Sequence, residues 1–575
     1  MRKLLRFIKG YRKEAFLAPL FKLFEAVLEL LVPIVVASLI DVGIKGNNRT
    51  YIVNMALIMI ALGFSGLIAS VTAQYFSAKA ASGFAEKMKD ALFSHIESLS
   101  ASDRDKLGSS TLITRLTSDA QLVQNGINMF LRLFLRSPFV VLGAAVMAFT
   151  VDSTLAWIFV VIIPVLSVIV FLIMRYTVPM YKEVQRGLDK VTAKTRENLS
   201  GVRVIRAFCK EEEENAEYED ALGSLYDMQI SSGQISALMN PVTYIVINLA
   251  VIVIVYFASQ RFSMNLIETG AIIALVNYMN QILAELVKLA NLIITITRAI
   301  AAGDRIESVF EIKPSITSSS SKTGDSSNGE AFSFDNITLK YSEEGRPALE
   351  GISLSARKGE KIGIIGGTGS GKTSLVNLLP RIYDVSSGTV SVCGLPVKDW
   401  DIDALRKEIA VVPQKAMLFK GTIRDNLKWG NKEASDAVLL EALKRAQALE
   451  FVLEKEGGLS YMLSARGRNL SGGQRQRLSI ARALVKPASI LILDDSASAL
   501  DYKTEQKLRE AISELDTTLI VVSQRTGSLM TMDRIAVLDN GKLIDFASHD
   551  ELLSRCRVYQ EIYNSQFGSR EAGND

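Results

Sequence analysis

Cysteine and histidine are scarce in this sequence of 575 residues, which contains three cysteines and two histidines. The cysteines, Cys209, Cys393 and Cys556, lie far apart, so the sequence excludes a disulfide scaffold and indicates free thiols in a reducing compartment. With only His95 and His549 present, a histidine-rich metal site cannot be assembled. Any mechanism that needs a third histidine is excluded by number.

An excess of charge of one sign is also missing. The chain has 65 basic and 61 acidic residues, a net charge of +4, and the basic residues are not concentrated in one patch. Nucleic acid is therefore not expected as a partner, because phosphate neutralisation needs clustered positive charge. A hydrophobic content of 49% excludes a disordered or collagen-like chain.

Long apolar stretches dominate the first 300 residues, and six of them are long enough to cross a bilayer core of ~30 Å. They lie near residues 15–40, 51–78, 128–150, 154–178, 237–260 and 270–297. An even number of spans places both termini on one side of the membrane. Six Lys or Arg among the first 14 residues, against three in the presumed outer loops, predict that this side is cytoplasmic. The first apolar segment is too long and too charged for a signal peptide.

The sequence changes character after residue 310. A polar run, SITSSSSKTGDSSNGE, cannot bury a core and predicts a flexible linker over 311–330. From Ala331 onward, short β-rich runs alternate with helical segments, which is typical of a largely parallel sheet. The predicted fold class is an all-α membrane domain with six helices and two long intracellular loops (1–310), followed by a cytosolic α/β P-loop domain (331–575).

A complete phosphate-binding loop, GGTGSGKT, occupies 366–373 directly after a β-rich run. Its glycines allow backbone N–H groups to close around phosphates, Lys372 can reach the β and γ oxygens, and the Thr373 hydroxyl can ligate Mg²⁺. The apolar run that ends at Asp494 supplies a buried carboxylate, as the metal side of such a site requires. These residues predict a phosphate-binding site that also holds Mg²⁺.

The sequence LSGGQ at 470–474 and the sequence VPQ ending at Gln414 lie between these two segments. With them, the chain resembles the nucleotide-binding domain of ATP-binding cassette (ABC) transporters. The resemblance implies that Tyr341 stacks on adenine and that 498–501 form the D-loop. The nucleotide contacts that it implies are Tyr341, Gly366, Gly367, Thr368, Gly369, Ser370, Gly371, Lys372, Thr373, Ser374, Gln414, Ser471, Gly472, Gly473 and Gln474, with Thr373, Gln414 and Asp494 as Mg²⁺ ligands.

The membrane half is similar to the exporters of the same family. Residues 114–124 (TRLTSDAQLVQ) and 196–214 (RENLSGVRVIRAFCKEEEE) resemble the family's two intracellular loops. In that family these loops end in coupling helices that contact the nucleotide domains, and two nucleotide domains pair head to tail. Each ATP then lies between one chain's phosphate loop and the other chain's LSGGQ. One chain with six spans is therefore identified as a half-transporter that needs a second half-transporter.

Two positions depart from the family's pattern. The glutamate that polarises the attacking water falls at Asp495, and the switch histidine falls at Gln524. The shorter Asp side chain withdraws the carboxylate by ~1.5 Å, which is large against the hydrogen-bonding range of a general base. The turn 464–467 also lacks the family's usual acid. We expect slow hydrolysis at a degenerate site, as in one subunit of heterodimeric bacterial multidrug exporters, where a non-identical partner retains the Glu and His.

Two functions of different classes fit these features. The first is a subunit of an ATP-driven exporter in the cell membrane, which moves amphipathic compounds (drugs, lipids or peptides) and donates its LSGGQ to the partner's active site. The second is an ATP-gated channel or regulatory membrane protein of the same fold. Substrate-independent conduction in reconstituted membranes would favour the second function.

Charged residues inside the apolar spans permit two interpretations. Lys22, Glu25 and Glu29 lie in the first span, and Glu285 and Lys288 in the sixth. Because each group holds both signs, the residues can form ion pairs that fix helix packing or snorkel. Alternatively, intramembrane carboxylates can face a cavity that recognises cationic amphipathic compounds.

Overall fold

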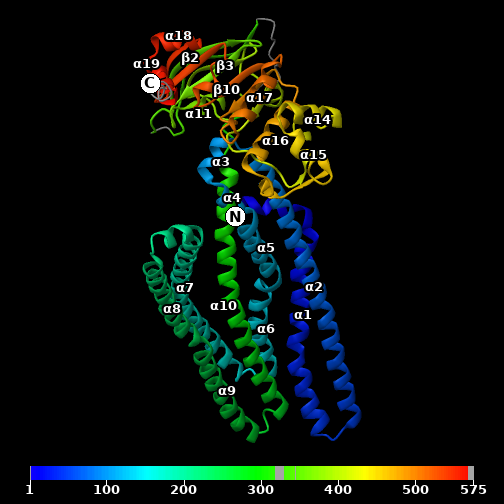
Figure 1. The fold of residues 1–575 in the computed structure, drawn as a ribbon. Coiled ribbons are helices and arrows are strands. Elements are labelled where there is room, and N and C mark those ends of the chain that lie inside the picture. The colour runs from blue at the N-terminus through cyan, green and yellow to red at the C-terminus, as the bar shows by residue number, and fades with distance from the viewer. Residues whose placement is uncertain (1, 318–328, 343–344, 568–575) are drawn as a thin grey trace. The chain divides into compact units, whose positions relative to one another are not determined.

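The computed structural model describes residues 2–317, 329–342 and 345–567, and these form two compact units. The first unit comprises Met1–Glu97 and Gly108–Ile312, and the second comprises Ser98–Leu107 and Lys313–Asp575. Figure 1 shows long helices in the first unit and mixed strands and helices in the second. Residues 318–328 of the predicted linker 311–330 lie outside the described residues.

Six helices of the first unit are long and apolar enough to cross a membrane, which confirms the six-helix membrane domain. They span Lys3–Ile44, Arg49–Ser98, Ser109–Val151, Ala156–Ala207, Glu211–Ser263 and Thr269–Glu311. Within these spans lie η1 (Arg2–Tyr11), α1 (Arg12–Ser38), η2 (Leu39–Ile44), α2 (Arg49–Ser98), α4 (Ser109–Thr114), η3 (Arg115–Asp119), α5 (Ala120–Met129), η4 (Phe130–Phe134), α6 (Arg136–Val151), α7 (Ala156–Ala207), α8 (Glu211–Ala237), α9 (Met239–Ser263) and α10 (Thr269–Glu311).

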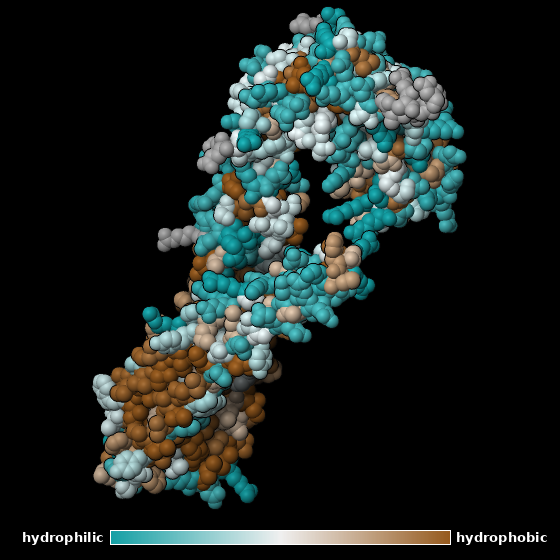
Figure 2. All heavy atoms as spheres, turned by 60° about the vertical axis from the view of Figure 1, so that its left-hand side comes forward, coloured by the Kyte–Doolittle hydropathy of each residue, from teal (hydrophilic) through white to brown (hydrophobic). Residues whose placement is uncertain are grey.

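Several helices continue well past the apolar stretches that define the spans. The 52 residues of α7 rise ~78 Å at 1.5 Å per residue, more than twice the ~30 Å of a hydrocarbon core. In Figure 2 the hydrophobic side chains gather over one part of the helix bundle, and hydrophilic side chains cover its continuation. The segments between the apolar stretches are thus largely continuations of the same long helices.

The bundle interior is built mainly from small and aliphatic side chains of α1, α6, α7, α9 and α10. Tyr278 of α10 is fully buried there, and its hydroxyl donates a hydrogen bond to the Leu30 carbonyl oxygen of α1 at 2.7 Å. A buried tyrosine hydroxyl needs such a partner because an unsatisfied polar group in an apolar interior is costly. This contact ties α10 to α1 at the core.

A six-stranded sheet forms the centre of the second unit, with strand order β12-β11-β3-β10-β9-β6. The pairs β11–β3, β3–β10, β10–β9 and β9–β6 are parallel, and β12 is antiparallel to β11, which confirms the largely parallel sheet. The strands are β3 (Lys361–Gly366), β6 (Ile409–Val412), β9 (Ile490–Asp494), β10 (Thr518–Val522), β11 (Arg534–Asp539) and β12 (Lys542–Ala547). All five residues of β9 are buried, as a central strand covered on both faces requires.

A separate antiparallel sheet of order β2-β1-β4-β5 packs into a core shared with β3, β9 and β10. Its strands are β1 (Glu330–Leu339), β2 (Leu349–Arg357), β4 (Ser387–Val392) and β5 (Leu395–Pro396), and a short pair joins β7 (Gly421–Thr422) to β8 (Met462–Leu463). The helices of this unit are α3 (Ala101–Leu107), α11 (Lys372–Val376), α12 (Ile402–Glu408), α13 (Ile423–Lys428), α14 (Asp436–Arg445), α15 (Leu449–Leu453), η6 (Gly458–Ser460), η7 (Ala465–Gly467), α16 (Gly472–Val485), α17 (Tyr502–Ser513), η8 (Thr526–Ser528), α18 (His549–Arg555) and α19 (Arg557–Phe567).

The helix α3 belongs to the second unit although its sequence lies between two membrane spans. Asp103 at its start accepts hydrogen bonds from the backbone and side chain of both Ser100 and Ser315. Burial raises the pKa of Asp103, but these hydrogen bonds outweigh it and leave the pKa below its usual value. At the same helix, the Tyr383 hydroxyl donates to Asp105 at 2.8 Å. The segment 98–107 between the second and third spans is therefore anchored by polar contacts within the second unit.

Candidate nucleotide-binding site

The predicted site residues follow four strands that are neighbours in the sheet. The phosphate loop follows β3, Gln414 follows β6, Asp495 follows β9 and Gln524 follows β10. These strands are parallel and stand in the order β3-β10-β9-β6. Their carboxyl ends meet at one edge of the sheet, which is where open α/β sheets bind ligands.

Glycines shape the phosphate loop between β3 and α11. A Cβ atom at Gly366 would lie 2.2 Å from the Leu538 carbonyl oxygen, closer than real Cβ contacts. Gly371 has φ +96°, and a Cβ atom there would lie 2.8 Å from the Ala348 carbonyl oxygen. Side chains at these positions would clash with backbone, so the loop depends on glycine to keep its N–H groups available.

Lys372 is buried within the loop that it follows. Its ammonium donates hydrogen bonds to the carbonyl oxygens of Gly366 at 2.9 Å and Gly367 at 2.7 Å, and to Ser370 Oγ at 3.4 Å. Burial lowers the pKa of Lys372, while Asp495 and Asp494 oppose the shift. A cation held in place by backbone carbonyls is positioned to bind phosphate oxygens that enter the loop.

Thr373 and Asp494 bring two oxygen atoms together beside the loop. Thr373 Oγ1 donates to Asp494 Oδ1 at 3.1 Å, and burial raises the pKa of Asp494 although that hydrogen bond lowers it. The described residues contain no group of three or more His, Cys, Asp or Glu side chains that could hold a metal. The two oxygens of Thr373 and Asp494 fit Mg²⁺, which takes one or two protein ligands and completes its shell with water and phosphate oxygens.

Asp495 lies beside the carboxyl end of β9 in an unusual backbone conformation, with φ +45°. Its carboxylate accepts a hydrogen bond from Gln414 Nε2 at 3.3 Å, and its N–H donates to the Val522 carbonyl oxygen at 3.0 Å. The structure thus brings together Asp495, at the position of the family's catalytic glutamate, and Gln414, which the sequence predicts as a nucleotide contact. Asp tolerates the left-handed region better than most residues with a Cβ.

Gln524 follows β10 and has an exposed side chain. The preceding residue, Ser523, donates its N–H to the Ile364 carbonyl oxygen of β3 at 3.1 Å, which fixes the end of β10 beside the strand that leads into the phosphate loop. The Gln524 carbonyl oxygen accepts a hydrogen bond from Gln566 of α19 at 2.8 Å. The switch position therefore lies on a well-anchored backbone.

Tyr341 is half exposed and lies close to the phosphate-loop helix. Its hydroxyl shares a hydrogen bond with Ser374 Oγ at 2.7 Å, and its ring meets that of Tyr383 edge to face at 5.2 Å between centroids. Burial and the contact with Asp105 raise the pKa of Tyr383 to about 12. The sequence does not indicate Tyr383, because its two contacts join residues that are far apart in the chain.

The LSGGQ segment forms the first turn of α16. Ser471 caps this helix, with its hydroxyl accepting from the Gln474 N–H at 3.3 Å and its own N–H donating to Gln474 Oε1 at 3.0 Å. Ser471 and Gly472 are exposed, and a Cβ atom at Gly473 would lie 3.2 Å from the Ala499 carbonyl oxygen of the D-loop. The signature thus presents an accessible helix N-terminus, a favourable position for an anion.

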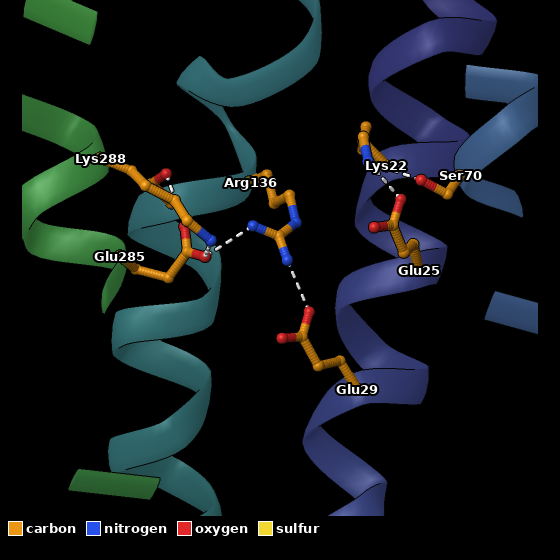
Figure 3. Close-up of polar contacts among 8 residues, drawn as sticks. Lys22, Glu25, Glu29, Ser70, Arg136, Glu285 and Lys288 are labelled. Atoms are coloured by element: carbon orange, nitrogen blue, oxygen red, sulfur yellow. Dashed lines mark hydrogen bonds and ion pairs between the residues drawn. The ribbon is translucent and has the colours of Figure 1, made fainter. Parts of the chain in front are cut away.

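The membrane charges form ion pairs, as the packing interpretation predicts. Lys22 donates to Glu25 at 2.5 Å and to Ser70 at 3.1 Å, and Lys288 donates to Glu285 at 2.9 Å. Figure 3 shows a further residue, Arg136, between Glu285 and Glu29. Arg136 was not among the predicted membrane charges, although an arginine inside the apolar span 128–150 is itself a signal of function.

Comparison with family models matches residues 15–286 to the ABC transporter transmembrane region and residues 349–498 to the ABC transporter domain. An uncharacterized ABC transporter ATP-binding protein of Bacillus subtilis, YfiB, is 36% identical over 568 residues and covers 99% of both chains. An ATP-dependent lipid A-core flippase of Pseudoalteromonas translucida is 31% identical over 99% of this chain and 98% of its own.

A putative multidrug export ATP-binding/permease protein of B. subtilis, YgaD, is 29% identical over 98% of this chain and 99% of its own. Among solved structures, a bacterial Atm1-family ABC exporter with ATP bound superimposes with a TM-score of 0.80. The match covers 96% of this chain and 98% of the other, at 22% sequence identity. This last similarity concerns the fold.

Proposed function

The chain belongs to the ABC transporter family as a half-transporter of the exporter type, and on that premise we propose that it is the degenerate-site subunit of a heterodimeric exporter. As an ABC exporter it is a multi-pass membrane protein with an ATP-hydrolysing domain. In the proposed complex it binds ATP and Mg²⁺ at its own phosphate loop, hydrolyses this ATP slowly, and supplies Ser471 and Gly473 to the partner's ATP. Both termini lie in the cytoplasm.

The observation that supports this proposal is which residues stand at the carboxyl ends of the parallel strands β9 and β10. Asp495 and Gln524 stand where the family places a glutamate and a histidine, and Asp495 is engaged by Gln414. A general base must lie within hydrogen-bonding reach of the water whose proton it takes. A carboxylate withdrawn by ~1.5 Å and a neutral amide in place of an imidazole both weaken that arrangement, whereas the LSGGQ turn is complete.

The proposed cargo is an amphipathic compound, a drug, a lipid or a peptide. Relatives described as a lipid A-core flippase and as a putative multidrug exporter support this class. Both match the chain over nearly its whole length, including the membrane domain through which a cargo passes.

Purification of the tagged chain from its native membrane tests the proposed assembly. We expect a second half-transporter in equal amount, with Glu after the strand that corresponds to β9 and His at its switch position. Vesicles that contain both chains should take up an amphipathic dye only when ATP is supplied. Isolation of the chain solely as a fast-hydrolysing homodimer would contradict the proposal.

Replacement of Lys372 should remove ATP binding from this chain. Lys372→Ala deletes the cation at the phosphate loop, and hydrogen bonds to charged groups contribute about 1.5–3 kcal/mol each, so we expect at least about tenfold weaker binding. Equilibrium titration with a fluorescent ATP analogue measures the effect. Lys358→Ala, at an exposed lysine on the same domain, is the control and should bind normally. Equal affinity in both variants would refute the assignment of Lys372.

A further inference from the structure

The guanidinium of Arg136 is buried in the membrane domain, where it joins three helices. Its Nη1 donates to Glu285 of α10 at 2.6 Å, and its Nη2 donates to Glu29 of α1 at 2.5 Å. Only 8% of the Arg136 side chain is exposed. Figure 3 shows the guanidinium between the two carboxylates.

Glu285 is a fixed counter-ion in this cluster. One of its oxygens accepts from Arg136 and from Lys288, and the other accepts from Ser137 Oγ at 2.8 Å. Its side chain is 3% exposed. Release of Glu285 would leave a buried carboxylate without these partners, which is costly.

Glu29 is held much less firmly than Glu285. Its side chain is 40% exposed, and a single carboxylate oxygen contacts the guanidinium. On either side of it along α1, the apolar side chains of Val27 and Leu31 are 41% and 37% exposed. Of the two carboxylates on Arg136, Glu29 is therefore the one that an incoming oxyanion can more readily replace.

The guanidinium edge at Glu29 has unused hydrogen-bonding capacity. Nε of Arg136 is buried and has no hydrogen-bond partner among the described residues. In an arginine, Nε and Nη2 face the same side and together bind two oxygens of a carboxylate or phosphate. Glu29 engages only Nη2, so an oxyanion that used both nitrogens would make one more hydrogen bond.

The position of the cluster indicates what kind of oxyanion can reach it. Glu285 lies 16 residues from Thr269, the first residue of α10, which corresponds to ~24 Å along the helix and falls within the apolar span 270–297. The exposed side chains beside Glu29 on α1, Val27 and Leu31, are apolar, so a ligand that reaches Arg136 from this side needs an apolar portion as well as its charged group. When Glu29 is displaced, two cations, Arg136 and Lys288, face one carboxylate, and the remaining positive charge complements an anion.

We propose that Arg136 binds the oxyanion head group of an amphipathic ligand through Nε and Nη2, and that the Glu29 carboxylate occupies this position until the ligand displaces it. The ligand class is a phosphate or carboxylate that carries an apolar tail. The interpretation of that ligand as cargo rests on the proposed export function. The binding itself does not depend on the export function, because it requires neither ATP nor a hydrolysing partner.

Binding of dodecyl phosphate to the full chain tests the proposal, in phosphatidylcholine nanodiscs without ATP. Dodecyltrimethylammonium has the same tail and the opposite charge, and inorganic phosphate has the charge without the tail. We expect dodecyl phosphate to bind at least about tenfold more tightly than either, which corresponds to one charge-assisted hydrogen bond. Equal affinity for the cationic detergent or for inorganic phosphate would overturn the proposal.

Three variants test whether dodecyl phosphate binds at Nε and Nη2 of Arg136. Arg136→Lys keeps the charge but lacks the planar pair of donors, so the affinity for dodecyl phosphate should fall about tenfold. Glu29→Gln removes the competing charge and should raise the affinity about tenfold. Glu25→Gln, one turn away on the same helix, is the matched control and should change it less than about twofold.

Glu29→Gln also preserves the test if Arg136→Lys does not fold. Unchanged affinity in Glu29→Gln, or the same change in Glu29→Gln and Glu25→Gln, would refute the displacement of Glu29. Failure of the export proposal would instead be seen in ATP turnover and dye uptake, which this binding measurement does not use.

Discussion

A carboxylate introduced at Gly473 is expected to abolish nearly all ATPase activity of the assembled exporter. In the proposed complex, Gly473→Asp places a negative charge against the γ-phosphate of the ATP that the partner binds. Close like charges at a desolvated interface cost several kcal/mol, and each 1.36 kcal/mol reduces a rate tenfold, so we expect a loss of at least about a hundredfold. ATPase assays on the co-purified pair measure it.

Two further variants serve as controls. One separates the effect of the added charge at Gly473 from the effect of the added size, and the other compares the two ATP sites. Gly473→Ala adds only the Cβ atom, which would lie 3.2 Å from the Ala499 carbonyl oxygen, and should cost far less than the aspartate. Asp495→Asn alters the site that we propose to be degenerate and should leave most of the activity. Equal losses from Gly473→Asp and Asp495→Asn would contradict the asymmetry.

Restoration of the family's residues should increase ATP turnover by the isolated chain. Asp495→Glu with Gln524→His supplies a carboxylate of normal reach and an imidazole at the γ-phosphate. General-base catalysis contributes about 10²–10⁴-fold, so an increase of at least about tenfold is expected even from incomplete alignment. Steady-state phosphate release by the purified chain at saturating ATP is the measurement.

The left-handed backbone conformation of Asp495 means that the double variant can also change the stability of the chain. Asp495 has φ +45°, a region that most L-residues occupy at a cost of about 1–2 kcal/mol. The melting temperature of the double variant must therefore be compared with that of the parent chain. Adding Lys372→Ala to the double variant should remove the gain, and a gain that persists would come from a contaminating ATPase.

Local segments of the nucleotide site were predictable from the sequence because each is determined by a short run of consecutive residues. The glycines of 366–373 determine a phosphate loop, and the apolar run before Asp494 determines a buried strand. The parallel orientation of their strands follows from alternating strands and helices, whereas the strand order is known only from the structure. The contact between Gln414 and Asp495 follows from β6 and β9 being neighbours.

Contacts that depend on how distant helices pack could not be predicted in the same way. Arg136 lies 107 residues from Glu29 and 149 from Glu285, and no periodicity links the three. The i, i+3 pairs Lys22–Glu25 and Glu285–Lys288 were foreseeable because helix geometry alone brings them together. Likewise, the path from Tyr341 through Tyr383 to Asp105 depends on the tertiary position of α3.

The ATP turnover of the unaltered, purified chain tests the central claim most directly. Phosphate release should be measured at saturating ATP and Mg²⁺, beside ATP binding by the same sample. The proposed degenerate site predicts that the chain binds ATP but releases phosphate slowly, and that release becomes fast when the partner is added. Brisk, vanadate-sensitive turnover by the chain alone would contradict it.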